Sequence, residues 1–552
     1  MIQQLLESAL QHAQAGRPQE AERLFRQVLA LEPRHAQAWQ NLGVALAQQG
    51  RVQEAMASFQ QALVIEPNYP EALYNLGNAY RDSERVDDAM AAYRQALVAR
   101  PNHGTARLNL AAALTSVGQV DQAIGILRRL VQDEANFVMA HSGLLFTLHF
   151  HPDSDGPSLL AEHRQWNDRH ARPLRSLIRP HENPGGAGHQ RRLRIGYVSA
   201  DFRFHPVGRF LAPLLAHHDH GQFEIFCYGD VRRADEMTGR LRGDCDVWRD
   251  IRGESDQRVA ELIRQDGIDV LVDLSLHASG NRLLVFARKP APVQVTYLAY
   301  CSTSGLETMD YRLTDPHFDP PGLNDANYSE TSIRLPRTYW CYEPWTPTPA
   351  VNDLPAQSTG RVTFGCLNNY GKVSPAAWRA WQALLLAAPN SRLLVHAPPG
   401  THQDQAAGAL SAAGVDPRRL SFVPNAPTDD YFRHYHRIDI ALDPFPYGGG
   451  TTTCDAIWMG VPVVTLAGRT GVGRGGASIL SNVGVPELIA NSVEQYVEMA
   501  RRLAGDLARL AKLRATLRQR MQASPLMDAA GFARDVEAAY RQMWHRWCKA
   551  GP

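Results

Sequence analysis

The sequence lacks the features that mark several large classes of protein. Its seven cysteines are an odd number, scattered over 552 residues without a Cys-x-x-Cys pair. This excludes a disulfide framework and a zinc finger, and it is typical of a reducing compartment. No apolar run approaches the roughly 18 residues that a membrane span needs. The first residues carry no basic or long apolar targeting segment. We therefore expect a cytoplasmic protein that does not engage a membrane.

The chain also has little excess charge. Lys and Arg number 57 against 56 Asp and Glu, which leaves a formal net charge of +1. Such balance argues against a general polyanion binder, so we expect no nucleic-acid partner. Because a single core rarely grows past about 250–300 residues, a chain of 552 residues predicts several domains.

A repeat occupies the first quarter of the chain. The string Ala-Trp-Gln-Asn-Leu-Gly at Ala38 returns, with changes, 34 residues later at Ala72 and again at Ala106. Other positions keep the same step: Ala21, Ala55, Ala89 and Ala123; Phe25, Phe59, Tyr93 and Leu127; Pro33, Pro67 and Pro101. This period resembles the tetratricopeptide repeat, a helix–turn–helix unit that stacks into a superhelix. We predict about four repeats over residues 1–136, then a helical cap and linker over 137–190.

One position in the first helix of each repeat holds an asparagine: Asn41, Asn75 and Asn109. A side-chain amide carries both donors and an acceptor, so these residues could pair with the backbone of an extended peptide in a concave groove. The alternative is a structural asparagine bonded to the neighbouring repeat. Tetratricopeptide arrays mostly bind proteins, which makes protein or peptide partners the expectation.

From residue 191 short β-rich runs alternate with helical stretches. We expect strands at 193–199, 224–228, 269–274, 293–300 and 311–314 in a first half, 191–350. A second half, 351–552, has expected strands at 362–367, 392–396, 420–423, 438–442 and 461–466, and ends in a helix over 529–548. This alternation predicts two doubly wound, Rossmann-like sheets, the arrangement called GT-B among glycosyltransferases. Segments 180–190 and 336–355 are predicted linkers.

The stretch Gly448–Asp455 reads Gly-Gly-Gly-Thr-Thr-Thr-Cys-Asp between an expected strand and an expected helix. Glycines allow close backbone approach, and a helix N-terminus offers unpaired N–H groups for a phosphate. The alternative is a glycine-rich turn with a threonine N-cap. Asp455 could accept the hydroxyls of a ribose, or could be a carboxylate favoured in the first turn.

Two further side chains follow expected strands. Lys372 is a candidate partner for a diphosphate, or a solvated loop lysine. His205, in Asp-Phe-Arg-Phe-His-Pro, could accept or position a proton near neutral pH, or bond to the backbone of its loop. Residues 471–476 satisfy G-x-G-x-x-G but come late in the second half, so we predict a flexible loop there. We expect no metal site.

The combination resembles the O-linked N-acetylglucosamine transferases, and among them a bacterial type, in which tetratricopeptide repeats precede a GT-B catalytic region. The blocks that carry the resemblance are 193–206, 288–294, 303–305, 309–311, 369–372, 422–427, 449–455 with Trp458 and Gly460, and 485–490. The resemblance implies an inverting, metal-independent transfer of GlcNAc from UDP-GlcNAc to Ser and Thr hydroxyls of proteins, without a cofactor.

The resemblance also implies roles for particular residues. His205 and Lys372 would be catalytic, with Lys372 neutralising the departing diphosphate. Contacts to the donor substrate would come from Asn369, Lys372, Ala426, Pro427, Tyr431, Gly450, Thr451, Thr452, Asp455 and Thr303. The animal enzymes differ here: they have His at the positions of Gly450 and Tyr431, Lys at that of Thr428, often Gln at that of Asn369, and a long insert between the lobes.

Three alternatives stay open. Spindly-type O-fucosyltransferases share this architecture and use GDP-fucose, and related enzymes glucosylate asparagine. A scaffold that binds a nucleotide without transferring a sugar is the third.

Overall fold

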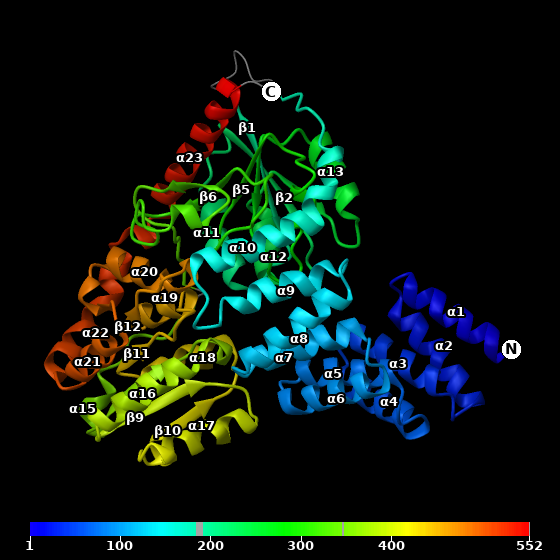
Figure 1. Cartoon of the computed structure of the whole chain (residues 1–552), viewed down its shortest axis with the longest axis horizontal. Helices are drawn as coiled ribbons and strands as arrows, with labels where there is room; N and C mark the ends of the chain where they lie inside the picture. The colour runs from blue at the N-terminus through cyan, green and yellow to red at the C-terminus, as the bar shows by residue number, and fades with distance from the viewer. Residues whose placement is uncertain (184–190, 345–346, 551–552) are drawn as a thin grey trace. The chain divides into compact units, whose positions relative to one another are not determined.

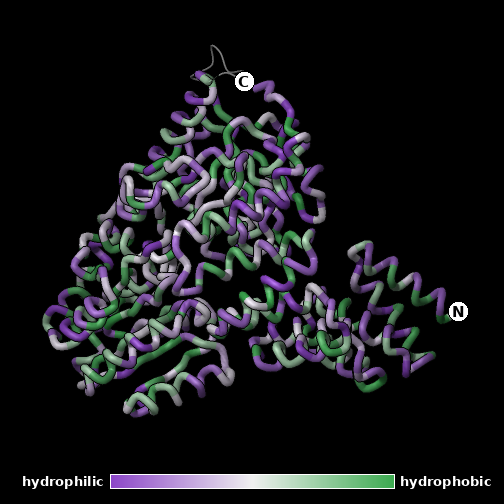
Figure 2. Tube along the Cα trace, viewed as in Figure 1, coloured by the Kyte–Doolittle hydropathy of each residue, from purple (hydrophilic) through white to green (hydrophobic). Residues whose placement is uncertain are grey.

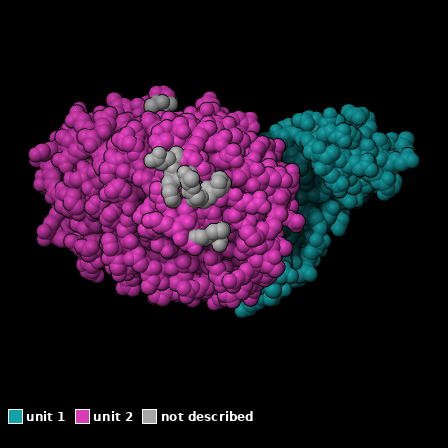
Figure 3. All heavy atoms as spheres, turned by 90° about the horizontal axis from the view of Figure 1, so that it is seen from above, with its two compact units in different colours: residues 1–140, 397–409, 422–424 teal, residues 141–396, 410–421, 425–552 magenta. Residues whose placement is uncertain are grey.

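A computed structural model describes residues 1–183, 191–344 and 347–550. The chain divides into two compact units (Figure 3): residues 1–140, 397–409 and 422–424 form one, and residues 141–396, 410–421 and 425–552 form the other. Of the predicted linkers, residues 184–190 and 345–346 lie outside the described residues. Among the described residues, no helix combines the length and apolar character needed to cross a bilayer.

Paired helices of near-equal length form the array of repeats (Figure 1). They are α1 Ile2–Gln14, α2 Pro18–Leu31, α3 Ala36–Gln48, α4 Val52–Ile65, α5 Pro70–Asp82, α6 Val86–Ala99, α7 Gly104–Ser116 and α8 Val120–Asp133. The second helix of each of the first three pairs ends two residues before Pro33, Pro67 or Pro101, since proline cannot continue a helix. Hydrophobic and hydrophilic residues alternate along these helices (Figure 2).

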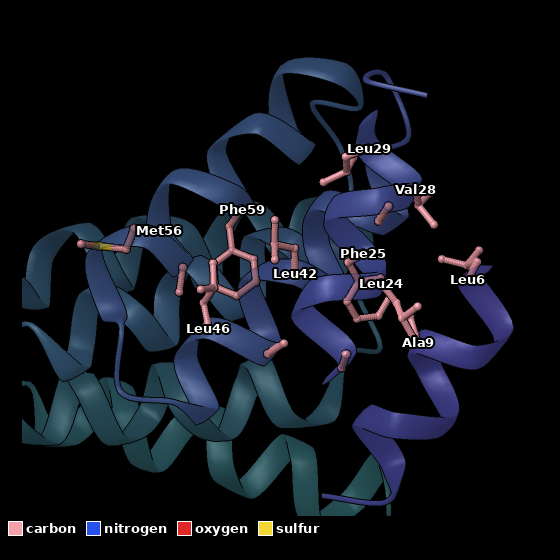
Figure 4. Packing of buried hydrophobic residues seen from close by; sticks show 14 of the residues in the cluster. Leu6, Ala9, Leu24, Phe25, Val28, Leu29, Leu42, Leu46, Met56 and Phe59 are labelled. Carbon is pink, nitrogen blue, oxygen red and sulfur yellow. The ribbon is translucent and has the colours of Figure 1, made fainter. Parts of the chain in front are cut away.

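The 34-residue period of the repeat reflects the way its paired helices pack. A Cβ built on Gly43 would lie 2.5 Å from the ring of Phe59, and one on Gly77 would lie 2.6 Å from the ring of Tyr93. In these two repeats the aromatic ring of the second helix therefore fills the hole that a glycine leaves in the first. Phe59 belongs to a core with Phe25 and Leu42 (Figure 4). This confirms the predicted repeat architecture.

The first α/β lobe follows a helical cap, α9 Val138–Leu148 and α10 Gly156–Trp166. Its sheet has the order β3-β2-β1-β4-β5-β6-β7, and each neighbouring pair is parallel. The strands are β1 Leu193–Ser199, β2 Phe223–Gly229, β3 Val247–Asp250, β4 Val270–Asp273, β5 Val293–Thr296, β6 Tyr311–Thr314 and β7 Thr331–Arg334. The helices are α11 Pro206–Leu215, α12 Glu236–Gly243, α13 Asp256–Gln265 and α14 Leu283–Phe286.

The second lobe repeats this plan. Its sheet has the order β10-β9-β8-β11-β12-β13, with β8 Val362–Cys366, β9 Ser391–His396, β10 Leu420–Val423, β11 Ile440–Leu442, β12 Val463–Leu466 and β13 Ile489–Ala490. Its helices are α15 Pro355–Thr359, α16 Pro375–Ala387, α17 Thr401–Ala412, α18 Thr428–His434, α19 Thr451–Trp458, α20 Gly475–Val483, α21 Val493–Ala504 and α22 Leu507–Gln522. Two parallel Rossmann-like sheets after a helical repeat array are the predicted fold.

The last helix, α23 Ala529–Ala550, returns to the first lobe (Figure 1). The hydroxyls of Tyr540 and Tyr197 lie 3.1 Å apart, and Glu537 lies 2.9 Å from His218. The terminal helix therefore packs on the first lobe, although it follows the second lobe in the chain.

The prediction of a flexible loop at 471–476 is wrong. Residues Gly471–Gly473 form a buried 3-10 turn, and Gly475 begins α20. A Cβ on Gly471 would lie 2.2 Å from the carbonyl oxygen of Cys301. The glycines are there because this turn packs tightly on the first lobe.

Candidate active site

Both sheets reverse their strand order at one point, and both points carry candidate residues. The order reverses between β1 and β4 in the first sheet and between β8 and β11 in the second. Ligands of doubly wound sheets bind outside the carboxyl ends of the strands at such a switch point. His205 follows β1, Lys372 follows β8, and the Gly448–Asp455 stretch follows β11.

The Gly448–Asp455 stretch caps and begins α19. Gly450 is the N-cap, and Thr451 is the first helical residue. Glycine is required one residue earlier, because a Cβ on Gly449 would lie 2.2 Å from Thr453 Oγ1. The backbone N–H groups of the first turn have no partner within the helix and carry the positive end of its dipole. This arrangement suits an anion.

The three threonines of this stretch differ in their surroundings. Thr452 Oγ1 donates to Asn368 Oδ1 at 2.8 Å. Thr453 Oγ1 donates to the buried carboxylate of Asp443 at 3.0 Å. Thr451 stays half-buried at the start of the helix. Two hydroxyls thus hold the loop in shape.

Lys372 lies directly against the glycine loop. Its Nζ donates to the carbonyl oxygen of Gly448 at 3.0 Å and lies 4.1 Å from the ring centroid of Tyr447. Burial lowers the pKa of Lys372 to about 8, although the nearby Asp443 opposes this change. The site therefore holds a cation whose charge is sensitive to pH slightly above neutrality.

Asp443 is the buried counterpart of that cation. It comes directly after β11, and a Cβ on Gly476 would lie 2.5 Å from its Oδ2. Burial raises the pKa of Asp443, while the hydrogen bonds of Thr465 and Thr453 and the charge of Lys372 act in the opposite direction. Asp443 thus anchors the glycine loop through its hydrogen bond with Thr453.

His205 is the N-cap of α11 and is half-buried. Its Nδ1 accepts a hydrogen bond of 3.3 Å from the backbone N–H of Val207. Burial lowers the pKa of His205, despite Asp201 at 3.6 Å. A neutral imidazole has one donor and one acceptor nitrogen, so Nε2 carries the hydrogen. In this form Nε2 of His205 can donate a hydrogen bond to an oxygen.

Asp455 is almost fully buried and bridges the two lobes. Its carboxylate accepts bonds from Arg209 Nη1 at 3.1 Å and Nη2 at 2.7 Å. It also accepts from the hydroxyls of Tyr342 at 2.7 Å and Tyr431 at 3.0 Å. A carboxylate offers about four lone-pair sites, so these four bonds occupy Asp455. Burial disfavours the charged form of Arg209, but Asp455 outweighs this and raises its pKa.

The remaining predicted donor contacts are less closely grouped. Asn369 is exposed and caps the turn that carries Lys372, because its Oδ1 accepts from the N–H of Gly371 at 3.0 Å. Ala426 is half-buried, and Pro427 is the exposed N-cap of α18. The same helix brings Tyr431 to Asp455.

Thr303 lies apart from this group. It is fully buried, and its hydroxyl donates to Glu330 at 2.7 Å. It also accepts from the N–H of Gly305 at 3.2 Å and of Ser329 at 3.1 Å. These bonds make Thr303 part of the framework of its own loop.

In the repeats, Asn109 has the structural role that was the alternative. Its Nδ2 donates to Asn78 Oδ1 at 2.7 Å and to the hydroxyl of Tyr74 at 3.3 Å, both on the preceding repeat. Asn41 and Asn75 are half-buried at the matching positions. Their binding of a peptide stays a prediction.

Sequence reasoning missed several residues of the site: Arg209, Tyr342, Asn368 and Asp443. Asn368 and Asp443 end strands or follow them at once, so the rule that found Lys372 could have found them. Arg209 and Tyr342 contact Asp455 from 246 and 113 residues away. A local pattern gives no sign of such pairs.

Known proteins that resemble the chain agree with this picture. A family model described as glycosyl transferase family 41 matches residues 179–352 and 347–536. Tetratricopeptide-repeat models match residues 6–72, 58–91 and 81–143. A solved structure of a mutant O-GlcNAc transferase from Thermobaculum terrenum has 36% identity and a TM-score of 0.87, and the match covers 93% of this chain and 98% of that one.

Curated plant proteins match as well. One from Petunia hybrida, described as a "probable UDP-N-acetylglucosamine–peptide N-acetylglucosaminyltransferase SPINDLY", is 38% identical over 73% of this chain and 44% of its own length. A protein from Arabidopsis thaliana described in the same words, but as SEC, is 30% identical over 67% of this chain and 39% of its own length. The chain thus spans less than half the length of these relatives. With repeats, fold and catalytic region in agreement, the chain belongs to glycosyl transferase family 41.

Proposed function

We propose that the protein moves GlcNAc from UDP-GlcNAc to Ser and Thr hydroxyls of other proteins. The observation that carries this proposal is the position of Lys372 against the glycine loop that begins α19, with Nζ 3.0 Å from the Gly448 carbonyl oxygen. A cation and a helix N-terminus at the switch point of a parallel sheet are what a nucleotide diphosphate requires.

In the proposed reaction the acceptor oxygen attacks the anomeric carbon in line with the departing nucleotide. A new C–O bond forms, the bond from the sugar to the β-phosphate breaks, UDP leaves with the electron pair, and the hydroxyl proton passes to water or to a diphosphate oxygen. Negative charge grows on the diphosphate as that bond breaks. In this proposal Lys372 and the N–H groups of Gly450 and Thr451 stabilise this charge, and preorganised groups of this kind usually supply the largest part of catalysis. The proposal needs no metal and no cofactor.

The donor is proposed to be surrounded in the same site by Asn369, Ala426, Pro427, Thr451 and Thr452. Asp455 already accepts four hydrogen bonds, from Arg209, Tyr342 and Tyr431. A ribose hydroxyl can therefore bind this carboxylate only if it displaces one of them. We therefore assign Asp455 the positioning of Arg209, Tyr342 and Tyr431 around the nucleotide. His205, with a hydrogen on Nε2, is proposed to orient an oxygen of the substrates.

The repeats are proposed to select protein acceptors, as arrays of this kind present an extended concave surface. Asn41 and Asn75 are the proposed contacts to the acceptor backbone.

The identity of the donor is the point to test first. Purified protein is incubated with a bacterial lysate and radiolabelled UDP-GlcNAc, UDP-glucose or GDP-fucose, and the label in protein is counted. We expect label from UDP-GlcNAc alone, removable by β-elimination from Ser and Thr. Label from GDP-fucose alone would replace this proposal with O-fucosylation. Label from none of the three, with nucleotide still bound, would leave a scaffold.

A further inference from the structure

The indole of Trp340 lies against the start of two helices of the second lobe, although Trp340 follows β7 of the first lobe. A Cβ on Gly450, the N-cap of α19, would lie 3.1 Å from its Cη2 atom. A Cβ on Gly475, the first residue of α20, would lie 3.2 Å from its Cζ2 atom. The ring therefore occupies the space that side chains at 450 and 475 would take.

Neighbouring aromatic side chains hold the indole in place. The ring centroid of Phe210, on α11, lies 5.0 Å away, and that of Tyr339 lies 4.9 Å away in an edge-to-face arrangement. Trp340 is only 7% exposed. Its backbone N–H donates to Thr338 Oγ1 at 3.0 Å. The position of the ring is thus set by packing on both lobes.

In the part of the chain that the structure describes, the N–H group of this indole contributes no hydrogen bond to the stability of the fold. Within the described residues, the buried Nε1 has no hydrogen-bond partner, whereas a buried tryptophan N–H usually finds one. Leaving a buried donor unpaired is unfavourable. A bulky ring kept at that cost against the glycine loop points to a role for its shape.

We propose that Trp340 is a specificity-determining residue of the nucleotide-sugar site, because its indole fixes the width of the space between α19 and α20. This inference rests on the proposed function. Gly450 and the ring work as a pair: the residue at 450 is small because the wall is supplied by Trp340 from the other lobe. A smaller side chain at 340 would widen the site and admit donors with a larger sugar substituent.

The test uses four variants of the full chain: Gly450→Ala, Trp340→Leu, the double variant, and Gly239→Ala as a control. A Cβ on Gly239, within α12, meets nothing within 4 Å. Titration calorimetry gives the Kd of UDP, of UDP-GlcNAc and of a UDP-GlcNAc analogue with an enlarged N-acyl group. Circular dichroism melting of each variant separates lost binding from lost folding.

We expect Gly450→Ala to weaken UDP-GlcNAc binding about tenfold, as one misplaced methyl in a fitted pocket does, and the double variant to recover most of this loss. For Trp340→Leu we expect the ratio of the Kd of the enlarged analogue to the Kd of UDP-GlcNAc to fall about tenfold. The Kd of UDP should change little. The control should bind as the wild type does.

Two results would overturn the inference: Gly450→Ala binding UDP-GlcNAc normally, or Trp340→Leu changing the three affinities by the same factor. Failure of the wild type to bind any of the three ligands would instead reject the proposed function, so the two failures are distinct.

Discussion

Arg209 donates two hydrogen bonds, of 3.1 and 2.7 Å, to the carboxylate of Asp455 and so joins α11 of the first lobe to α19 of the second. The side chain of Arg209 is 10% exposed and that of Asp455 is 1% exposed. His205 begins α11 and Gly450 caps α19. This ion pair therefore fixes the distance between the helices that carry the candidate catalytic histidine and the phosphate site.

Removing one partner of this pair should be costly. In Arg209→Met, Asp455 stays buried with only Tyr342 and Tyr431 as donors. An uncompensated buried charge typically costs about 3–5 kcal/mol, so we expect urea unfolding to show a loss of that size. The double variant Arg209→Met/Asp455→Leu should recover much of it. Equal stability of Arg209→Met and the wild type would show that the pair contributes nothing.

The charge of Lys372 should appear in the pH dependence of transfer. The pKa of Lys372 is lowered from about 10.5 to about 8 by burial, and the proposed role needs the protonated form. Activity should therefore be present below pH 8 and fall as the pH rises through 8. We expect this limb in kcat/KM for the donor, which reports the free enzyme. Lys372→Arg, always charged, should be slower but should lack the limb. A limb unchanged in that variant would assign it to another group.

A cluster of buried histidines should make the unit that contains residues 141–396 less stable in acid. Burial lowers the pKa of His141 to about 3 and the pKa values of His163 and His170 to about 4, against about 6.5 in an unfolded chain. The unfolded state then binds more protons below pH 6.5, so the stability falls as the pH drops from about 6.5 to about 4. We expect urea midpoints to decline steeply between pH 7 and pH 5.

His149 offers a way to check that cause. Within the described residues, neither of its ring nitrogens has a hydrogen-bond partner, and burial lowers its pKa well below the usual value of a histidine. His149→Phe should keep the packing on Tyr300, whose ring lies 4.8 Å away, and should make the pH dependence shallower. A variant as acid-sensitive as the wild type would remove His149 from the explanation.

The repeats allow a comparison of two glycines. Gly77→Ala places a methyl 2.6 Å from the ring of Tyr93, and overpacking of this kind typically costs about 1–3 kcal/mol. Gly125, within α8, meets nothing within 4 Å. Gly125→Ala should therefore stabilise the array by up to about 1 kcal/mol through helix propensity. Thermal melting of both variants decides the matter, and shifts of the same sign would contradict the packing account.

Much of the fold could be predicted because its signals are local. The 34-residue step reflects contacts between adjacent helices, such as Gly43 with Phe59. The central strands are rich in apolar residues and are mostly buried, as in β1 and β8. The strands β3, β7 and β13 were missed because they are short and lie at or near the edges of the sheets, where part of each stays exposed.

The site was predictable only as far as strand ends mark it. Lys372 and the glycine loop follow β8 and β11, and the structure brings them together. The surroundings of Asp455 were not predictable, since Arg209 and Tyr342 reach it through the docking of one lobe on the other. Thr303 was chosen by resemblance alone, and it is buried against Glu330.

The most direct test of the central claim is the rate of transfer from saturating UDP-GlcNAc by the wild type and by Lys372→Ala. Loss of one preorganised charge at the developing diphosphate should lower kcat by about 10²–10³, with the melting temperature little changed. A variant that is folded and transfers within a few-fold of the wild-type rate would contradict the account.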